Sequence, residues 1–268
     1  ELPSSSYKVE YENNKTAGLA TVKIIGNTAN YWTGTYVKTF KITGSIADAE
    51  ITLPDQIYTG TAYTEDTLQE LQVVCDGMTL TRNVDYKVTD IKNATNAALS
   101  TAGATAPSIT IQGIGDYFAG TPTKTQTFSI KYDITSENLV VSEIADEIYT
   151  GAEIKPEVTV SYMTNTVLGT LAALKEGKDY SLTYRNNTEV ASANDARGPH
   201  VVITALEGGL LTSGYIIVPF TIKKVNLEEA EYGFRITGLE PQYMYTGREI
   251  RPAIQVENAD GKVLDEKN

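Results

Sequence analysis

The segment Ile57-Tyr58-Thr59-Gly60 decides the fold, because the chain contains it three times. It returns as Ile148-Tyr149-Thr150-Gly151 and, with one change, as Met244-Tyr245-Thr246-Gly247. The three tyrosines are separated by 91 and 96 residues. Self-similarity at a nearly fixed spacing is typical of tandem structural repeats.

Two further signatures recur in the same order. The first is Asp-Tyr-x-(Val/Leu), and it occurs at residues 85–88, at 179–182 and, without the Asp, at 7–11. The second is an aromatic turn that leads to Phe-x-Ile, and it occurs at residues 31–42, at 117–130 and in a degenerate form at 213–222. Three ordered signatures predict one module written three times.

The modules are out of phase with the ends of the sequence. We expect the back half of a repeat at 1–43, complete repeats at 44–131 and 132–223, and the front half of a repeat at 224–268. Joined end to start, the two halves rebuild a third repeat with its parts in order. Either the segment belongs to a longer array, or the halves complete each other between molecules. Boundaries placed before each Asp-Tyr signature are less favoured, since they would cut a hairpin such as Cys75-Asp76-Gly77-Met78.

Alternating hydrophobic residues and frequent turn signals predict β-strands throughout. Tyr7, Val9 and Tyr11 share one strand face, as do Ile109 and Ile111. Turn signals every 8–12 residues or so are typical of a β-sandwich. The sequence therefore predicts an all-β chain of tandem antiparallel sandwich modules in an elongated array, with β-grasp-like modules as the alternative.

Helical and turn positions complete the expected secondary structure. Residues 65–71 and 168–175 are each compatible with one or two helical turns, and Gly113-x-Gly115 reads as a hairpin rather than a dinucleotide-binding loop. Asp85 and Asp179 are expected to accept hydrogen bonds from nearby backbone N–H groups. The residues expected in left-handed turns are Asn13, Asn14, Asn186 and Asn187.

The ordered set of motifs resembles the tandem Ig-like (YDG/MBG-type) repeats of bacterial cell-surface proteins. The resemblance covers nearly the whole chain, and it departs from the pattern at Ala94, in the insertion at 164–171 and at Leu210-Leu211. It implies an extracellular location at the bacterial cell surface or cell wall. It also implies β-sandwich modules that act as spacers or adhesive stalks, without general catalytic residues.

Composition excludes several classes of function. The 268 residues include 22 Lys and Arg against 34 Asp and Glu, a net charge of -12 that opposes binding to nucleic acid or anionic membranes. No apolar run reaches the length of about 18 residues that a membrane helix needs. The one Cys and the one His provide neither a disulfide nor a zinc site. We therefore expect neither an enzyme nor a cofactor or metal site, with Cys75 a buried apolar residue and His200 structural.

Three residues are the candidates for chemistry or binding. Tyr31 and Trp32 at a turn are candidates for stacking on sugar rings, although the repeat also accounts for an aromatic residue there by packing. Lys38 shares strand parity with Phe40 and Ile42, so it is the candidate lysine of an isopeptide crosslink. A snorkelling Lys is the simpler interpretation.

The sequence thus predicts a non-enzymatic structural or adhesive segment of a bacterial surface protein or filament. Its partner is expected to be itself, head to tail through the split repeat, or neighbouring repeats of a longer chain. The alternative function is an extracellular carbohydrate-binding module that takes a host or dietary glycan.

Overall fold

The computed structural model describes residues 3–120, 122–226, 233–258 and 261–263. The chain is all-β, as predicted from the alternating pattern. Residues up to 143, together with 158–183 and 202–217, pack as one compact unit, and the other described residues form a second. The division between these units runs through residues 132–223. It does not coincide with the four predicted segments, which stay a prediction.

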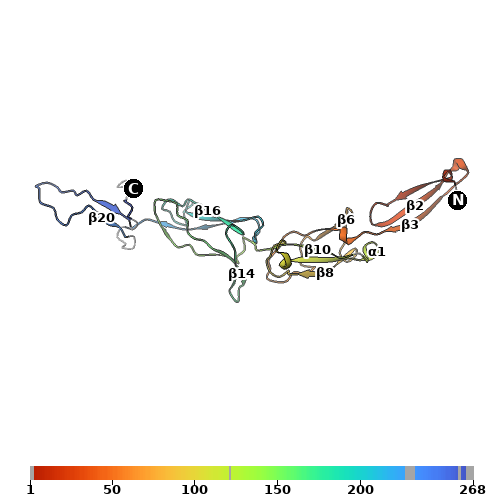
Figure 1. Ribbon diagram of the computed structural model, residues 1–268, viewed down its shortest axis with the longest axis horizontal. Helices are drawn as coiled ribbons and strands as arrows, with labels where there is room; N and C mark the ends of the chain where they lie inside the picture. Colours follow the sequence, from red (N-terminus) through yellow and green to blue (C-terminus); the bar gives the residue numbers. More distant parts are fainter. Residues whose placement is uncertain (1–2, 121, 227–232, 259–260, 264–268) are drawn as a thin grey trace. The chain divides into compact units, whose positions relative to one another are not determined.

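The described residues near the N-terminus form one antiparallel sheet in the order β1 (Tyr7–Glu12), β2 (Gly18–Gly26), β3 (Thr35–Ile42). Figure 1 shows β2 and β3 side by side in red and orange. Two short 3-10 turns, η1 (Ser4–Ser6) and η2 (Thr28–Asn30), flank these strands. Asn13 adopts a φ of 54° in the turn after β1, a conformation that Asn tolerates better than most residues.

Residues 44–131, the first of the two predicted complete repeats, contain two three-stranded sheets. We call the first of them the front sheet, and its order is β4 (Glu50–Thr52), β6 (Gln72–Cys75), β7 (Met78–Thr79). The second is the back sheet, whose order is β8 (Tyr86–Lys92), β9 (Ser108–Gly113), β10 (Lys124–Thr127). Side chains from both sheets share one buried cluster, which includes Val73, Cys75, Ile109 and Ile111. This is the sandwich-like core that the sequence predicts.

A parallel pair joins the front part of the repeat to its last strand. β5 (Gln56–Ile57) carries the Ile-Tyr-Thr-Gly signature and pairs in parallel with β11 (Ile130–Lys131) of the Phe-x-Ile signature. This short parallel pair adds to the antiparallel sheets that the sequence predicts. We call this pairing the closing pair.

Two short 3-10 turns also occur in this range: η3 (Ile46–Asp48) precedes β4, and η4 (Gly103–Thr105) precedes β9.

The second repeat has the same strand order. Its front sheet is β12 (Leu139–Val141), β14 (Val160–Asn165), β15 (Thr170–Ala173), and its back sheet is β16 (Tyr180–Arg185), β17 (His200–Ala205), β18 (Tyr215–Pro219). Its closing pair is β13 (Glu147–Ile148) with β19 (Ile222–Lys223), again parallel. Further on, β20 (Arg235–Thr237) pairs with β21 (Gln255–Glu257), and Glu257 bridges to Val263. These strands match a front sheet; residues 264–268 lie outside the described residues.

Two predicted helices are absent. Residues 65–71 form turns, and residues 168–175 contain strand β15, because the insertion at 164–171 makes the β14–β15 hairpin. The α-helix seen in the described residues is the single turn α1 (Gly115–Phe118), set within the predicted hairpin connection of β9 to β10. No long helix supports the β-grasp alternative within these ranges.

The N-terminal sheet β1–β2–β3 has the same strand order as the two back sheets, and we call it a back sheet too. A β-bulge brings the three back sheets into register. The pairing of β8 with β9 shifts between Val88 and Asp90, so this strand has one residue more than β1 or β16 before its turn. As a result Asn93 takes the place of Asn13 and Asn186, and each of the three has a φ of 54°. The left-handed conformation is confirmed for the first Asn of each pair. It is wrong for Asn14 and Asn187.

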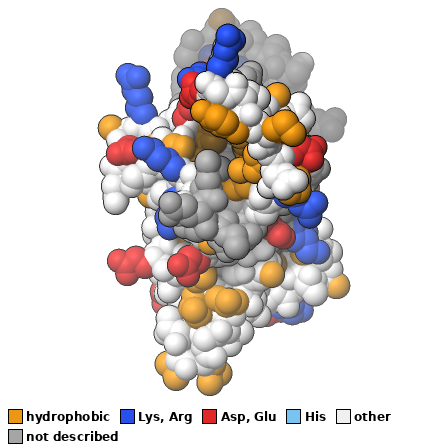
Figure 2. Space-filling model, turned by 90° about the vertical axis from the view of Figure 1, so that its left-hand side faces the viewer, with side chains coloured by type: hydrophobic (Ala, Val, Ile, Leu, Met, Phe, Trp, Pro, Cys, Tyr) orange, Lys and Arg blue, Asp and Glu red, His pale blue; other side chains and the backbone are white. Residues whose placement is uncertain are grey.

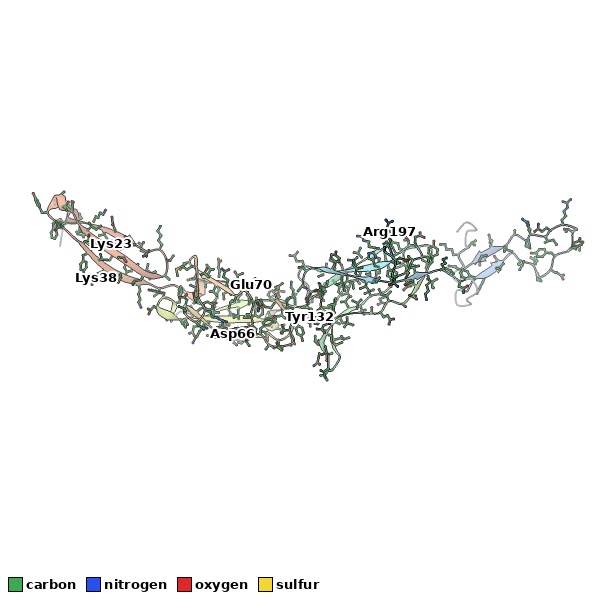
Figure 3. All side chains as sticks on the ribbon, turned by 180° about the vertical axis from the view of Figure 1, so that it is seen from behind. Lys23, Lys38, Asp66, Glu70, Tyr132 and Arg197 are labelled. Carbon is green, nitrogen blue, oxygen red and sulfur yellow. The ribbon has the colours of Figure 1, made fainter. Side chains whose placement is uncertain are left out.

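Three tyrosines cluster where residues 44–131 meet residues 132–223, inside one compact unit. The Tyr132 ring stacks on Tyr162 with centroids 4.2 Å apart, and it meets Tyr58 edge-on at 5.1 Å. Tyr132, labelled in Figure 3, is buried and belongs to the predicted ladder of Phe128, Ile130 and Ile134. The cluster therefore joins side chains from both ranges in one aromatic contact.

Tyr132→Ala should lower the free energy of unfolding by about 3 kcal/mol, because it leaves a cavity and removes two aromatic contacts. Tyr132→Phe keeps the ring and should cost less than about 1 kcal/mol. Urea unfolding of both variants measures the difference. Equal losses in the two variants would contradict a packing role for the ring.

Candidate functional site

Each complete repeat is closed by two backbone hydrogen bonds that run from its front half to its last strand. In both repeats the donors are the N–H group of the Tyr in Tyr-Thr-Gly and that of the residue two positions before it, and the acceptors are carbonyls of the Phe-x-Ile-x strand. The bonds are Gln56 to Ser129 and Tyr58 to Lys131, both 2.8 Å, then Glu147 to Thr221, 2.9 Å, and Tyr149 to Lys223, 3.0 Å. The closing pair is therefore a constant part of the module.

The second repeat has further hydrogen bonds between its front half and its back sheet, and two of them come from side chains; we call this set of bonds the closure. The Ile154 N–H donates to the Asn187 carbonyl at 2.8 Å, and Asn187 Nδ2 donates back to the Ile154 carbonyl at 2.9 Å. The Tyr184 hydroxyl donates to the Pro156 carbonyl at 2.5 Å. Asn187 and Ile154 are both buried, so these bonds form away from water. In the first repeat only the backbone bond remains, from Tyr63 N–H to the Ala94 carbonyl at 2.9 Å.

The same closure residues occur in the two half-repeats, but on opposite parts of the chain. Residues 7–14 repeat the Tyr-x-x-x-Tyr-x-Asn-Asn pattern of 180–187, which places Tyr11 and Asn14 at the positions of Tyr184 and Asn187. Residues 247–252 repeat the Gly-x-Glu-Ile-(Lys/Arg)-Pro pattern of 151–156, which places Ile250 and Pro252 at the positions of Ile154 and Pro156. Each half therefore carries one side of the closure.

The back sheet of the N-terminal half is open on its core face. Phe40 is 39% exposed, whereas its counterparts Phe128 and Phe220 are each 2% exposed. Ile24 is likewise exposed where Ile111 and Ile203 are fully buried. Their equivalence follows from the strand registers, in which Gly26 pairs with Tyr7 as Gly113 pairs with Tyr86. This face therefore has the composition of a buried core, but its side chains are exposed to solvent.

The C-terminal half is exposed in the same manner. Ile250 is 39% exposed, against 7% for Ile154. The other large apolar residues exposed there are Ile236, Leu239, Tyr243, Met244, Tyr245, Ile254 and Val263. Figure 2, viewed from the side on which Figure 1 draws β20, shows hydrophobic side chains at the surface. A patch of this kind is typical of an interaction surface.

The two halves carry opposite net charge. Residues 1–43 contain five Lys and three Glu, for a net charge of +2, although the whole chain has a net charge of -12. Residues 224–268 contain six Lys and Arg against nine Asp and Glu, for a net charge of -3. Complementary charge favours encounter between the two halves and opposes encounter between identical ones.

The predicted glycan-stacking residues lie on the loop between β2 and β3. Tyr31 is 97% exposed and has a φ of 68°, and Trp32 is 42% exposed. Lys38 lies across from Val22 on the neighbouring strand, on the face opposite to Lys23 (Figure 3). Lys38 is exposed, so it lacks here the desolvation that an isopeptide reaction requires. Glycan stacking and a crosslink at Lys38 stay predictions.

The remaining candidate residues have structural contacts. His200 Nδ1 lies 3.0 Å from the Gly198 carbonyl, and Cys75 is buried with its Sγ 3.4 Å from the Ser45 carbonyl. Asp85 accepts from the Thr81 N–H at 2.8 Å, and Asp179 from the N–H groups of Lys175 at 2.9 Å and Leu210 at 3.0 Å, which confirms the predicted carboxylate caps. In the part of the chain that the structure describes, no cluster of His, Cys, Asp and Glu has a metal-binding arrangement.

Comparison with known proteins gives no family. No protein-family model and no curated sequence matches the chain. None of the helices among the described residues has the length and hydropathy of a membrane span.

Burial perturbs the signature tyrosines and the thiol. Desolvation raises the pKa of Tyr86 and of Tyr180, the tyrosines of the Asp-Tyr signature. Burial, followed by the nearby Asp76 carboxylate, raises the pKa of Cys75 and keeps its thiol protonated and unreactive.

The stability of the chain should fall above pH 10, in part through Tyr86. The ordinary pKa of Tyr is 10.0, so the unfolded chain releases this proton before the folded chain does. The contribution is fully present below pH 10 and is lost as pH rises through the raised pKa of the folded state. Tyr86→Phe cannot titrate, so its unfolding free energy should fall less steeply between pH 9 and about 11.5 in urea titrations. Identical slopes for both chains would contradict this assignment.

Proposed function

We propose that this chain is a non-enzymatic structural segment of an extracellular bacterial surface protein, and that its copies join head to tail by completing the split repeat. In each joint the back sheet β1–β2–β3 of one copy receives the front half, residues 233–263, of a second copy. The joint has the parts of the complete repeats, supplied by two molecules. This is a form of strand addition to an exposed sheet.

The observation that carries the proposal is the matched pair of closure patterns. Tyr11 and Asn14 stand where Tyr184 and Asn187 bond to the carbonyls of Pro156 and Ile154, and the partner positions hold Pro252 and Ile250. The first repeat has neither pattern: Ile91 and Ala94 stand at the positions of Tyr184 and Asn187, and Tyr63 and Glu65 stand at the positions of Ile154 and Pro156. Retention of both sides in the split halves supports their pairing with each other.

The complete repeats define the register of the joint. In the closing pairs, Ile130 pairs with Gln56 and Ile222 pairs with Glu147. By the same alignment Ile42 pairs with Tyr243 of the second copy, and the Tyr243 and Tyr245 N–H groups donate to the Lys41 and Thr43 carbonyls. The Asn14 carbonyl accepts from the Ile250 N–H.

A second copy is favoured over an unrelated partner for two reasons. A segment that packs on the open back sheet must supply a strand equivalent to β5 and β13, and carbonyls equivalent to those of Ile154 and Pro156. Residues 243–252 align with both parts. The net charges of +2 and -3 on the two halves also attract. Because the joining surfaces differ, the contact is heterologous and extends into an open chain of copies rather than a closed dimer.

Carbohydrate binding is the second candidate function. The exposure of Tyr31 and Trp32 on one loop favours it, since rings that stack on sugars must be accessible. It ranks lower because Phe118, the counterpart of Trp32 in the first repeat, is 1% exposed and serves packing. Soluble oligosaccharides that shift the Trp32 fluorescence of the monomer would favour this second function.

Two variants, each blocked at one end, test the assembly. Phe40→Asp places a charge on the open back sheet, and Ile250→Asp places one on the front half; both positions are exposed in the free chain, so folding should persist. We expect the unmodified chain to grow in mass with concentration, each variant alone to stay monomeric, and their equimolar mixture to form a dimer and nothing larger. Sedimentation velocity measures all three.

Val37→Asp and Arg248→Asp serve as matched controls. Val37 lies on the outer face of β3, and Arg248 stands at the position of the exposed Ala152. Both controls should assemble as the unmodified chain does. A chain that stays monomeric at all concentrations, or a mixture that does not dimerise, would overturn self-assembly and would assign the cover to other repeats of a longer chain.

A further inference from the structure

The loop between the last two strands of the first back sheet packs on Gly44, the residue at which the preceding half-repeat ends and residues 44–131 begin. Phe118 is 1% exposed and lies so close to Gly44 that a Cβ on Gly44 would overlap its ring. Ala17 is buried beside the same glycine and belongs to the same apolar cluster as Phe118. Next to it, the Gly44 N–H donates to the Tyr117 carbonyl at 3.0 Å. Gly44 is the second residue after the Phe-x-Ile signature, and Ala17 precedes β2.

The same arrangement recurs one repeat later with different residues. Tyr132, again the second residue after Phe-x-Ile, donates its N–H to the Leu210 carbonyl at 2.8 Å. The next residue, Leu211, is 1% exposed. The Tyr132 carbonyl in turn accepts from the Thr212 N–H at 2.9 Å. Both places therefore share one buried apolar residue beside a backbone hydrogen bond from the second residue after Phe-x-Ile, and the second place adds the bond from Thr212.

A third set of these positions exists without its contacts. Trp32 corresponds to Phe118 and Leu211, but it is 42% exposed. The second residue after the third Phe-x-Ile is Lys224, and the counterpart of Ala17 is Val190, because Ala191 bridges to Ile222 as Gly18 pairs with Ile42. Lys224 is exposed and Val190 is 39% exposed.

We infer that Trp32 is a docking residue that packs on Val190 and the backbone of Lys224 of a second copy, beside a hydrogen bond from the Lys224 N–H to the Tyr31 carbonyl. The inference rests on the proposed head-to-tail assembly and adds a second contact to it. Trp32 then becomes buried at the joint, as Phe118 is buried against Gly44 inside the chain. Aromatic residues in such desolvated positions contribute strongly to interface affinity.

The chain has a single Trp, so its fluorescence reports on this contact alone. As the concentration of the unmodified chain rises, the Trp32 emission should shift to shorter wavelength, and iodide quenching should fall. Both changes should follow the same concentration dependence as the mass measured by sedimentation. In the monomeric Ile250→Asp variant the emission should stay unshifted.

Variants on both sides of the contact test its energetics. Trp32→Ala and Val190→Asp should each weaken assembly by about tenfold or more, which is the effect of removing one aromatic anchor or its pocket. Val167→Asp changes an equally apolar but 90% exposed residue at the tip of the β14–β15 hairpin, and it should leave assembly unchanged. Addition of soluble oligosaccharides to the Ile250→Asp monomer should leave the emission unchanged.

The outcomes separate the docking contact from the assembly itself. Assembly with unchanged emission, and with full affinity in Trp32→Ala and Val190→Asp, would overturn the role of Trp32 and leave head-to-tail joining intact. Absence of assembly in the unmodified chain would overturn both. A shift caused by an oligosaccharide in the monomer would assign Trp32 to glycan binding instead.

Discussion

The closure of a front half onto the last strand of its back half is the constraint on which the rest of this structure depends. A three-stranded sheet with one apolar face cannot bury that face alone, and the parallel closing pair brings the second layer to it. Two backbone hydrogen bonds set the register, and both complete repeats use the same two positions. Where the closure is made, Phe128 and Phe220 are buried; where its two sides lie at different ends of the sequence, Phe40 is exposed.

This constraint connects stability with function. Burial of the exposed side chains of both halves stabilises the joint by about 25 cal/mol for each Å² of apolar surface removed from water. The strands of both halves are already formed before the halves meet. Preformed strands reduce the entropy lost on association. The same physical contacts that hold residues 44–131 together therefore serve, in our proposal, as an intermolecular joint.

The sequence predicts the parts of this module that depend on local pattern. The repeat spacing, the alternating strands, the buried ladder from Phe128 to Ile134 and the carboxylate caps at Asp85 and Asp179 all follow from residues close in sequence. The parallel pairing of Gln56 with Ile130 does not, because it joins segments far apart in the chain that carry no mutual periodicity.

Other parts were set by tertiary context. Residues 168–175 are compatible with a helix by composition, but pairing with β14 makes Thr170–Ala173 a strand. The closure residues had a signal in the sequence, the Ile-(Lys/Arg)-Pro shared by 154–156 and 250–252, but its meaning requires the bond from Tyr184. The role of Trp32 likewise depends on the burial of Phe118 against the preceding repeat.

The most direct measurement of the joint is a disulfide between the closure positions of two molecules. Asn14→Cys and Ile250→Cys are placed in separate chains that also carry Cys75→Ala, and the chains are mixed and oxidised. Head-to-tail joining predicts a mixed disulfide dimer on non-reducing gels. Its yield should be far higher than in a control mixture in which Val84→Cys, at an exposed position, replaces Asn14→Cys. Equal yields from the two mixtures would contradict it.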